Sequence, residues 1–217
     1  NVLEKGELAT EAAVEAIEQK RNEIINSVHA QKAQQDIGAL FNAMSPRYRL
    51  FMPAQAILEH INLYHRLGAA DFLWDIKRSA DANTRSVTIC AKDRPGLISK
   101  IAGVFTLNNI DILDVQVFTW RNNIALDIFK VKPPPDQLLE DEKWKRAEKN
   151  LNRALSGQLD LAAALEKRLQ RLTQPNGRRA INATGIFINN IQKMDHKNTP
   201  DIIAPSQGVH IVLDKSF

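Results

Sequence analysis

Apolar residues recur at helical spacing through the first third of the chain. Between residues 8 and 43 they stand three, four or seven positions apart, with charged side chains between them, which predicts a helix. Ser45-Pro46 predicts a break, because proline disfavours helical geometry in the residue before it. A second helix is predicted from Ala54 to Leu67, with Gly68 as its stop. Residues 1–70 are therefore interpreted as a helical segment.

Beyond residue 70 the pattern changes to short alternating elements. A short strand is predicted around Phe72–Ile76, and period-two alternation predicts three more strands further on. Arg121-Asn122-Asn123 is typical of a hairpin turn. The elements expected after the first strand are strands at 86–91, 110–119 and 124–131 and helices at 97–105, 138–155 and 159–172. Their order is β-α-β-β-α.

The last stretch differs in character. Residues 173–178 combine turn formers with the first of two adjacent arginines, which predicts an exposed linker open to trypsin at Arg178 and Arg179. Short strands are predicted at Arg179–Ala183 and Val209–Leu213. The expected organisation is a helical segment at 1–70, an α/β unit with its following helices at 71–172, and a tail at 173–217.

Composition narrows the function classes. Hydrophobic residues make up 44% and charged residues 25%, as in ordinary globular proteins, and the net charge of +4 is too mild to indicate nucleic-acid binding. The basic run Lys143–Arg153 is interpreted as the solvated face of an amphipathic helix. The single cysteine, Cys90, is predicted to be a buried, inert thiol, which favours a reducing compartment. No apolar run reaches the ~20 residues of a membrane span.

The turn Asp93-Arg94-Pro95-Gly96 is the candidate site. It joins a predicted strand to a predicted helix, whose first backbone N–H groups have no partners within the helix and favour negative charge. A carboxylate or phosphate suits such a place, and Gly96 permits close approach to the backbone. The alternative is purely structural, with Asp93 capping the helix and Pro95 starting it. His60 and His65 lie five residues apart, off a common helical face, and do not indicate a metal site.

The residues from Thr88 to Gly103, with their Asp-Arg-Pro-Gly-Leu turn, resemble the opening of an ACT domain. Asn109–Thr119 followed by Ala125–Phe129 resembles the first ACT domain of the bacterial bifunctional uridylyltransferase/uridylyl-removing enzymes. Ser45–Tyr48 and the helix through His60 are similar to the segment before that domain. The resemblance covers roughly residues 1–172.

This resemblance implies an α+β fold, in which a helical segment precedes a ferredoxin-like ACT unit whose last strand is missing or replaced. It implies glutamine or another small amino acid as ligand, bound near Asp93, Arg94, Gly96, Leu97 and Ile98, with Asp111 and Asp114 as weaker candidates. In the family a nucleotidyltransferase domain adds UMP to the P-II protein and a phosphohydrolase domain removes it, with magnesium.

No motif of either catalytic domain is found in this chain. The expectation is therefore a cytoplasmic, non-catalytic regulatory fragment without a cofactor. Its expected partners are the amino acid, P-II through the parent enzyme and, through the ACT sheet, a second copy of the chain. Nucleic acid and membrane are not expected partners.

The missing last strand raises a question about the sheet edge at Ser86–Ala91. An unpaired edge is a template for any available strand. Arg179–Ala183 is one candidate to fill it. The expectation favours an edge that stays open or pairs with a second copy, because Arg178 and Arg179 resist burial.

The tail has a resemblance of its own. Ile181–Phe187 and Pro205–Asp214 are similar to an internal stretch of FAD-dependent glycerol-3-phosphate dehydrogenases, which implies a join near residue 175. No Gly-x-Gly-x-x-Gly is present to hold a dinucleotide, so no flavin is expected. Two alternatives to the sensor thus remain: a dehydrogenase fragment, and an ACT dimerisation module with no ligand.

Overall fold

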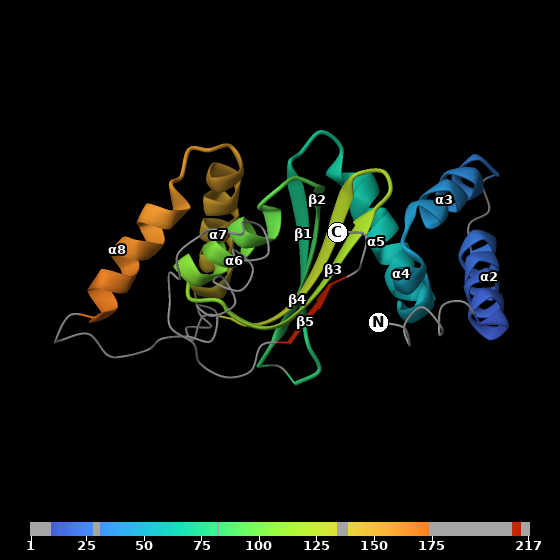
Figure 1. The fold of residues 1–217 in the computed structure, drawn as a ribbon, viewed down its shortest axis with the longest axis horizontal. Helices are drawn as coiled ribbons and strands as arrows, with labels where there is room; N and C mark the ends of the chain where they lie inside the picture. The colour runs from blue at the N-terminus through green and yellow to red at the C-terminus, as the bar shows by residue number, and fades with distance from the viewer. Residues whose placement is uncertain (1–9, 28–30, 82, 134–138, 174–209, 214–217) are drawn as a thin grey trace.

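The computed structural model describes residues 10–27, 31–81, 83–133, 139–173 and 210–213. A single twisted sheet stands in the middle, with one group of helices on each face (Figure 1). The helices are α2 (Glu11–Asn26), α3 (Gln31–Ala43), α4 (Pro46–Phe51), α5 (Ala54–Leu67), α6 (Leu97–Leu107), α7 (Glu140–Leu155) and α8 (Leu161–Thr173). The strands are β1 (Phe72–Arg78), β2 (Arg85–Lys92), β3 (Asp111–Trp120), β4 (Ile124–Lys132) and β5 (His210–Leu213).

The sheet confirms the predicted α+β architecture. Its strand order is β1-β2-β4-β3-β5, with antiparallel pairing throughout except for β5, which runs parallel to β3. The order β2-α6-β3-β4-α7 is the predicted β-α-β-β-α unit. A β-bulge interrupts the register of β3 between Ile112 and Asp114.

The edge of β2 is where the sequence-based expectation was wrong. β1 pairs with the whole of β2, from Phe72 opposite Ala91 to Arg78 opposite Arg85, so this edge is neither open nor left for a second copy. The replacement strand comes from upstream in the chain. Arg179–Ala183, the other candidate, lies outside the described residues.

A short connection explains why β1 takes this place. It returns the chain from β1 to β2 with Asp81 accepting hydrogen bonds from the Thr84 backbone N–H at 3.0 Å and from the Thr84 hydroxyl at 2.8 Å. Closing so short a loop costs less entropy than bringing back a segment that lies roughly ninety residues away.

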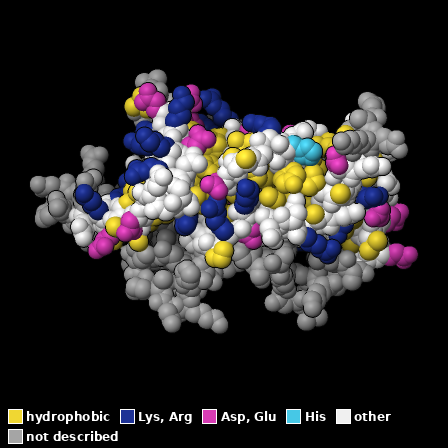
Figure 2. Space-filling model, turned by 90° about the horizontal axis from the view of Figure 1, so that it is seen from above, with side chains coloured by type: hydrophobic (Ala, Val, Ile, Leu, Met, Phe, Trp, Pro, Cys, Tyr) yellow, Lys and Arg dark blue, Asp and Glu magenta, His cyan; other side chains and the backbone are white. Residues whose placement is uncertain are grey.

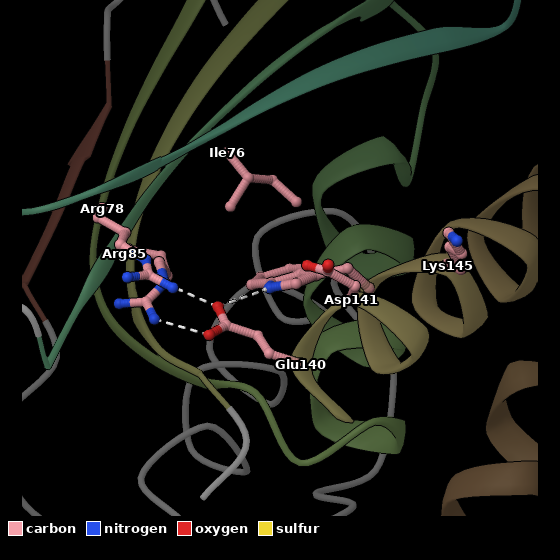
Figure 3. A pocket seen from close by; sticks show the side chains of 7 residues that line it. Ile76, Arg78, Arg85, Glu140, Asp141 and Lys145 are labelled. Atoms are coloured by element: carbon pink, nitrogen blue, oxygen red, sulfur yellow. Dashed lines mark hydrogen bonds and ion pairs between the residues drawn. The ribbon is translucent and has the colours of Figure 1, made fainter. Parts of the chain in front are cut away.

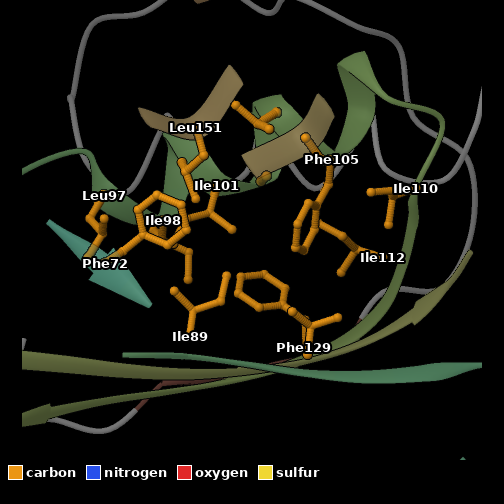
Figure 4. Close-up of a cluster of buried hydrophobic side chains, with 14 of the residues drawn as sticks. Phe72, Ile89, Leu97, Ile98, Ile101, Phe105, Ile110, Ile112, Phe129 and Leu151 are labelled. Carbon is orange, nitrogen blue, oxygen red and sulfur yellow. The ribbon is translucent and has the colours of Figure 1, made fainter. Parts of the chain in front are cut away.

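One face of the sheet packs under α6, α7 and α8 (Figures 1 and 4). The aromatic rings of Phe105 and Phe129 meet there edge to face at 5.2 Å. Gly103 lets α6 and α8 approach closely, since a Cβ at this position would lie 2.5 Å from Leu161 Cδ2. α7 presents its basic run outward and buries Trp144, Ala147 and Leu151, which confirms the amphipathic interpretation.

The opposite face packs under the N-terminal helices, so the helical segment and the sheet share a second core. Tyr48 lies at its centre, with its ring 4.9 Å from Phe118 and 6.1 Å from Trp120. The Tyr48 hydroxyl lies 2.6 Å from His60 Nδ1. Cys90 faces the same core and is fully buried, and burial raises the pKa of its thiol to about 12, as expected for an inert side chain.

The N-terminal helices differ in detail from the prediction. The single helix expected over 8–43 is two helices, since α2 ends at Asn26 with Ser27 as its C-cap and α3 begins at Gln31. Ser45 and Pro46 not only interrupt the helical pattern but also start α4, where the Ser45 side chain caps the Tyr48 N–H. α5 and its Gly68 stop agree with the prediction. Lys20 fastens α2 to the end of α4 by donating to three backbone carbonyls at 2.7–2.9 Å.

Candidate functional site

The turn from Asp93 to Gly96 joins β2 to α6, as predicted. The Asp93 N–H donates to the Asn123 carbonyl at 2.9 Å, which ties the turn to the β3–β4 hairpin. Gly96 is the residue before the helix and has φ of 76°, a left-handed conformation that L side chains rarely adopt.

The structure does not show the two structural roles suggested for Asp93 and Pro95. Asp93 does not cap the helix, because the N-cap is Gly96 and no side chain caps it. Pro95 does not start the helix, which begins at Leu97. The Leu97 N–H already bonds the Arg94 carbonyl at 3.2 Å.

The side chains of the turn divide into anchors and exposed groups. Leu97 and Ile98 are buried in the core under α6, so their side chains are not available to a ligand. Arg94 pairs with Asp71 at 2.8 Å and donates to the Leu155 carbonyl at 3.5 Å. Arg94 thus fastens the turn to the chain just before β1. Asp93 is half-buried.

Asp111 and Asp114, the weaker candidates, lie at the other end of the sheet. They stand opposite Lys132 and Lys130, whereas the turn adjoins Asn123 at the start of β4. Six or more strand residues separate them from the turn, which is about 20 Å at the usual rise per residue. The structure therefore does not bring them together with Asp93–Ile98.

A polar patch on the sheet face that α6 covers was not found from the sequence. Ala91 on β2 and Ala125 on β4 are cross-strand partners on the face that α6 covers, and Thr119 on β3 stands opposite Ala125. Asp127, two residues along β4, is 2% exposed on the same face. Asp93 extends the alternation of β2 on this face. We call Asp93, Thr119 and Asp127, around Ala91 and Ala125, the polar floor.

Two atoms of the polar floor are buried without a hydrogen bond. Asp127 Oδ1 and Thr119 Oγ1 have no partner within the part of the chain that the structure describes. Burial, together with the nearby charge of Asp93, holds the pKa of Asp127 well above its usual range. The sequence did carry a signal, since Asp127 occupies an inward position between Ala125 and Phe129.

A cavity of about 400 Å³ lies at the far end of β2, against the start of α7 (Figure 3). Arg85 donates two hydrogen bonds of 2.7 Å to the Glu140 carboxylate there, and Trp144 Nε1 donates to the same carboxylate at 3.1 Å. These bonds lower the pKa of Glu140. The ion pair is largely buried, with side-chain exposures of 4% and 11%. The two charged groups compensate each other. Because Arg85 begins β2 and Glu140 begins α7, the pair holds α7 against the sheet.

The described residues offer little evidence for other kinds of site. They contain no cluster of three His, Cys, Asp or Glu side chains able to hold a metal ion. None of their helices is long and apolar enough to cross a bilayer. On the face seen in Figure 2, Lys and Arg are interspersed with Asp and Glu, so no continuous basic patch forms there.

Comparison with known proteins agrees with the order of strands and helices from β2 to α7. The family model of the ACT domain matches residues 85–142. A bifunctional uridylyltransferase/uridylyl-removing enzyme of Rhodospirillum rubrum is 31% identical over 132 residues, which are 59% of this chain and 14% of the relative. Enzymes of the same name from Azospirillum brasilense and Erythrobacter litoralis are 36% and 34% identical, covering 38% and 41% of this chain and 9% and 10% of their own.

The chain thus spans about one seventh, or less, of the length of these relatives. Six curated relatives match, and the names of all six are those of uridylyltransferase/uridylyl-removing enzymes, which leaves the dehydrogenase alternative without support. No solved structure matches the chain.

Proposed function

Because residues 85–142 form an ACT domain similar to that of uridylyltransferase/uridylyl-removing enzymes, we propose that this chain is their amino-acid-sensing part. Its ligand is glutamine, and its role is regulatory. The observation that carries the proposal is that no side chain caps the start of α6. Gly96 is the residue before this helix, and Asp93 and Arg94 of the same turn are half-buried. A helix N-terminus without a side-chain cap favours a carboxylate such as that of an amino acid.

The proposal assigns the chemistry of uridylylation to other parts of the parent enzyme. The matched region is the ACT region alone, and the described residues hold no catalytic metal cluster. In this proposal the fragment works in the cytoplasm and reaches P-II only through the parent enzyme, which supplies the magnesium-dependent steps.

A dimerisation module without a ligand is the second candidate, and the sheet argues against it. β1 covers the edge of β2, and β5 covers β3 from Asp114 to Val117. Pairing through the sheet would therefore use the outer side of β1 or the rest of β3.

Titration of the whole chain with glutamine by calorimetry tests the sensor, with glutamate and asparagine as competitors. Gly96→Ala is expected to weaken binding at least tenfold, because a Cβ at φ of 76° strains the turn and obstructs the approach to the helix start. Gly157→Ala is the matched control, since Gly157 has φ of 74°, lies outside the turn, and would bring an added Cβ within 4 Å of no neighbouring atom. Equal affinities for the two variants would refute the proposed site.

A further inference from the structure

We propose that the polar floor receives the ammonium group of the amino acid whose carboxylate lies at the start of α6, with Asp127 as its principal partner. This inference rests on the proposed function and names a second half of the same site. It assigns a partner to the α-ammonium group of the ligand, as the start of α6 does to its carboxylate.

The position of the polar floor is the first argument. Asp127 is the cross-strand partner of Ile89, and Figure 4 shows Ile89 below Ile98, in the first turn of α6. Thr119 stands one pair nearer to the turn, opposite Ala125. The three oxygen-bearing side chains therefore flank the sheet surface between the Asp93 turn and the first turn of α6.

The small side chains at the centre are the second argument. Elsewhere this face of the sheet carries large residues, such as Phe129, Val131 and Ile89, that fill the space under the helices. At the polar floor the paired residues are Ala91 and Ala125. The two alanines reduce the bulk on the sheet between Asp93 and Asp127, whereas Asp127 itself pairs with Ile89 and Val117.

The chemistry of the polar floor is the third argument. A buried polar group without a hydrogen bond is costly, and Asp127 Oδ1 and Thr119 Oγ1 have no partner among the described residues. Asp93 and Asp127 both carry carboxyl groups, and the neighbouring cation Arg94 is already paired with Asp71. An ammonium group supplies three N–H donors and a positive charge, which match these acceptors.

Charge balance follows from the same arrangement. Asp93, from the turn, is the ionisable group whose charge acts on Asp127, and burial and Asp93 favour the protonated carboxyl when nothing cationic is near. The Cys90 thiol of β2 lies on the opposite face of the sheet. An incoming ammonium favours the carboxylate instead. The Asp127 proton then passes to the buffer as the ligand binds.

The test compares glutamine with glutaramate, which lacks only the α-ammonium group, by calorimetry on the full chain. The wild-type protein is expected to prefer glutamine at least tenfold and to release a proton, seen as different heats in phosphate and Tris buffers. Asp127→Asn keeps the size of the side chain but removes its charge. It is expected to bring the two affinities within threefold of each other and to abolish the proton release.

Asp75→Asn is the matched control, because it removes a half-buried carboxylate from β1, away from the polar floor. It is expected to leave the preference for glutamine unchanged. Melting temperatures of both variants report folding, so a folded Asp127→Asn protein that keeps the wild-type preference and proton release would overturn the inference.

The two proposals fail in different ways. If another amino acid binds instead of glutamine, the same comparison with its deaminated analogue tests the polar floor, while glutamine sensing has failed. If none of the twenty amino acids binds the wild-type chain, both are overturned. If glutamine binds and Asp127→Asn changes nothing, only the polar floor is refuted.

Discussion

Acid is expected to destabilise this protein through His60, which lies in the core between the N-terminal helices and the sheet. His60 is 7% exposed, and its Nδ1 lies 2.6 Å from the buried Tyr48 hydroxyl. Burial lowers the pKa of His60 to about 4, from an ordinary value of about 6.5. The unfolded chain therefore binds a proton between these two values that the folded chain does not.

The direction and size of the pH effect on the free energy of unfolding follow from the difference between the two pKa values. Stability from a neutral His60 is fully present above pH 6.5 and is lost as the pH falls towards 4. Between pH 7 and pH 4.5 the loss is about 2 kcal/mol, at 1.36 kcal/mol for each unit of pKa difference. The raised pKa of Asp127 acts in the opposite direction, because stability from that group is lost as the pH rises.

Urea unfolding at both pH values, followed by tryptophan fluorescence, measures this loss. The double variant Tyr48→Phe/His60→Leu removes the titrating group together with the hydroxyl that it would leave unpaired. The contribution of Asp127 is common to both proteins and cancels in the difference. His65→Leu, at an exposed position of α5, is the control and should behave like the wild type. If the double variant loses as much stability as the wild type between pH 7 and 4.5, the reasoning about His60 is refuted.

Four further outcomes are expected. Glu140→Gln should cost about 3 kcal/mol in urea unfolding, because it removes the negative charge that pairs with the buried Arg85 guanidinium; a cost near zero would contradict a buried pair. Phe72→Ala should cost about 3 kcal/mol if β1 belongs to the core, whereas a free linker would lose nothing. Gly103→Ala should lower the melting temperature, since its Cβ meets Leu161, while Gly38→Ala, with no neighbour nearer than 3.7 Å, should raise it; the same sign for both would refute the close approach of α6 and α8. The chain incubated with UTP, P-II and magnesium should give no modified P-II above a mock preparation.

Sequence reasoning succeeded where local pattern and local structure coincide. The strands at 86–91, 110–119 and 124–131 and the helix from Leu97 were found to within a residue or two. Alternation of period two and the breaker Asp93–Gly96 record the local backbone directly. The tail strand Val209–Leu213 was found in the same way, as β5.

It failed where distant segments meet. Phe72–Ile76 was recognised as a strand, but its pairing with β2 depends on competition among all strands for one edge. The Arg85–Glu140 pair joins residues 55 positions apart, and neither has a sequence signal that names the other. The polar floor draws on three strands, and only the register brings Thr119 and Asp127 under the first turn of α6.

The sequence by itself determined the type and order of the ACT elements, the turn at Asp93 and the apolar character of Cys90, because each depends on residues close along the chain. The tertiary structure alone decided that β1 closes the sheet, that the N-terminal helices cover its second face, and that Asp127 lies buried opposite Ile89. Local periodicity sets which face of a strand is apolar. Which elements then bury that face is settled by packing over the whole chain.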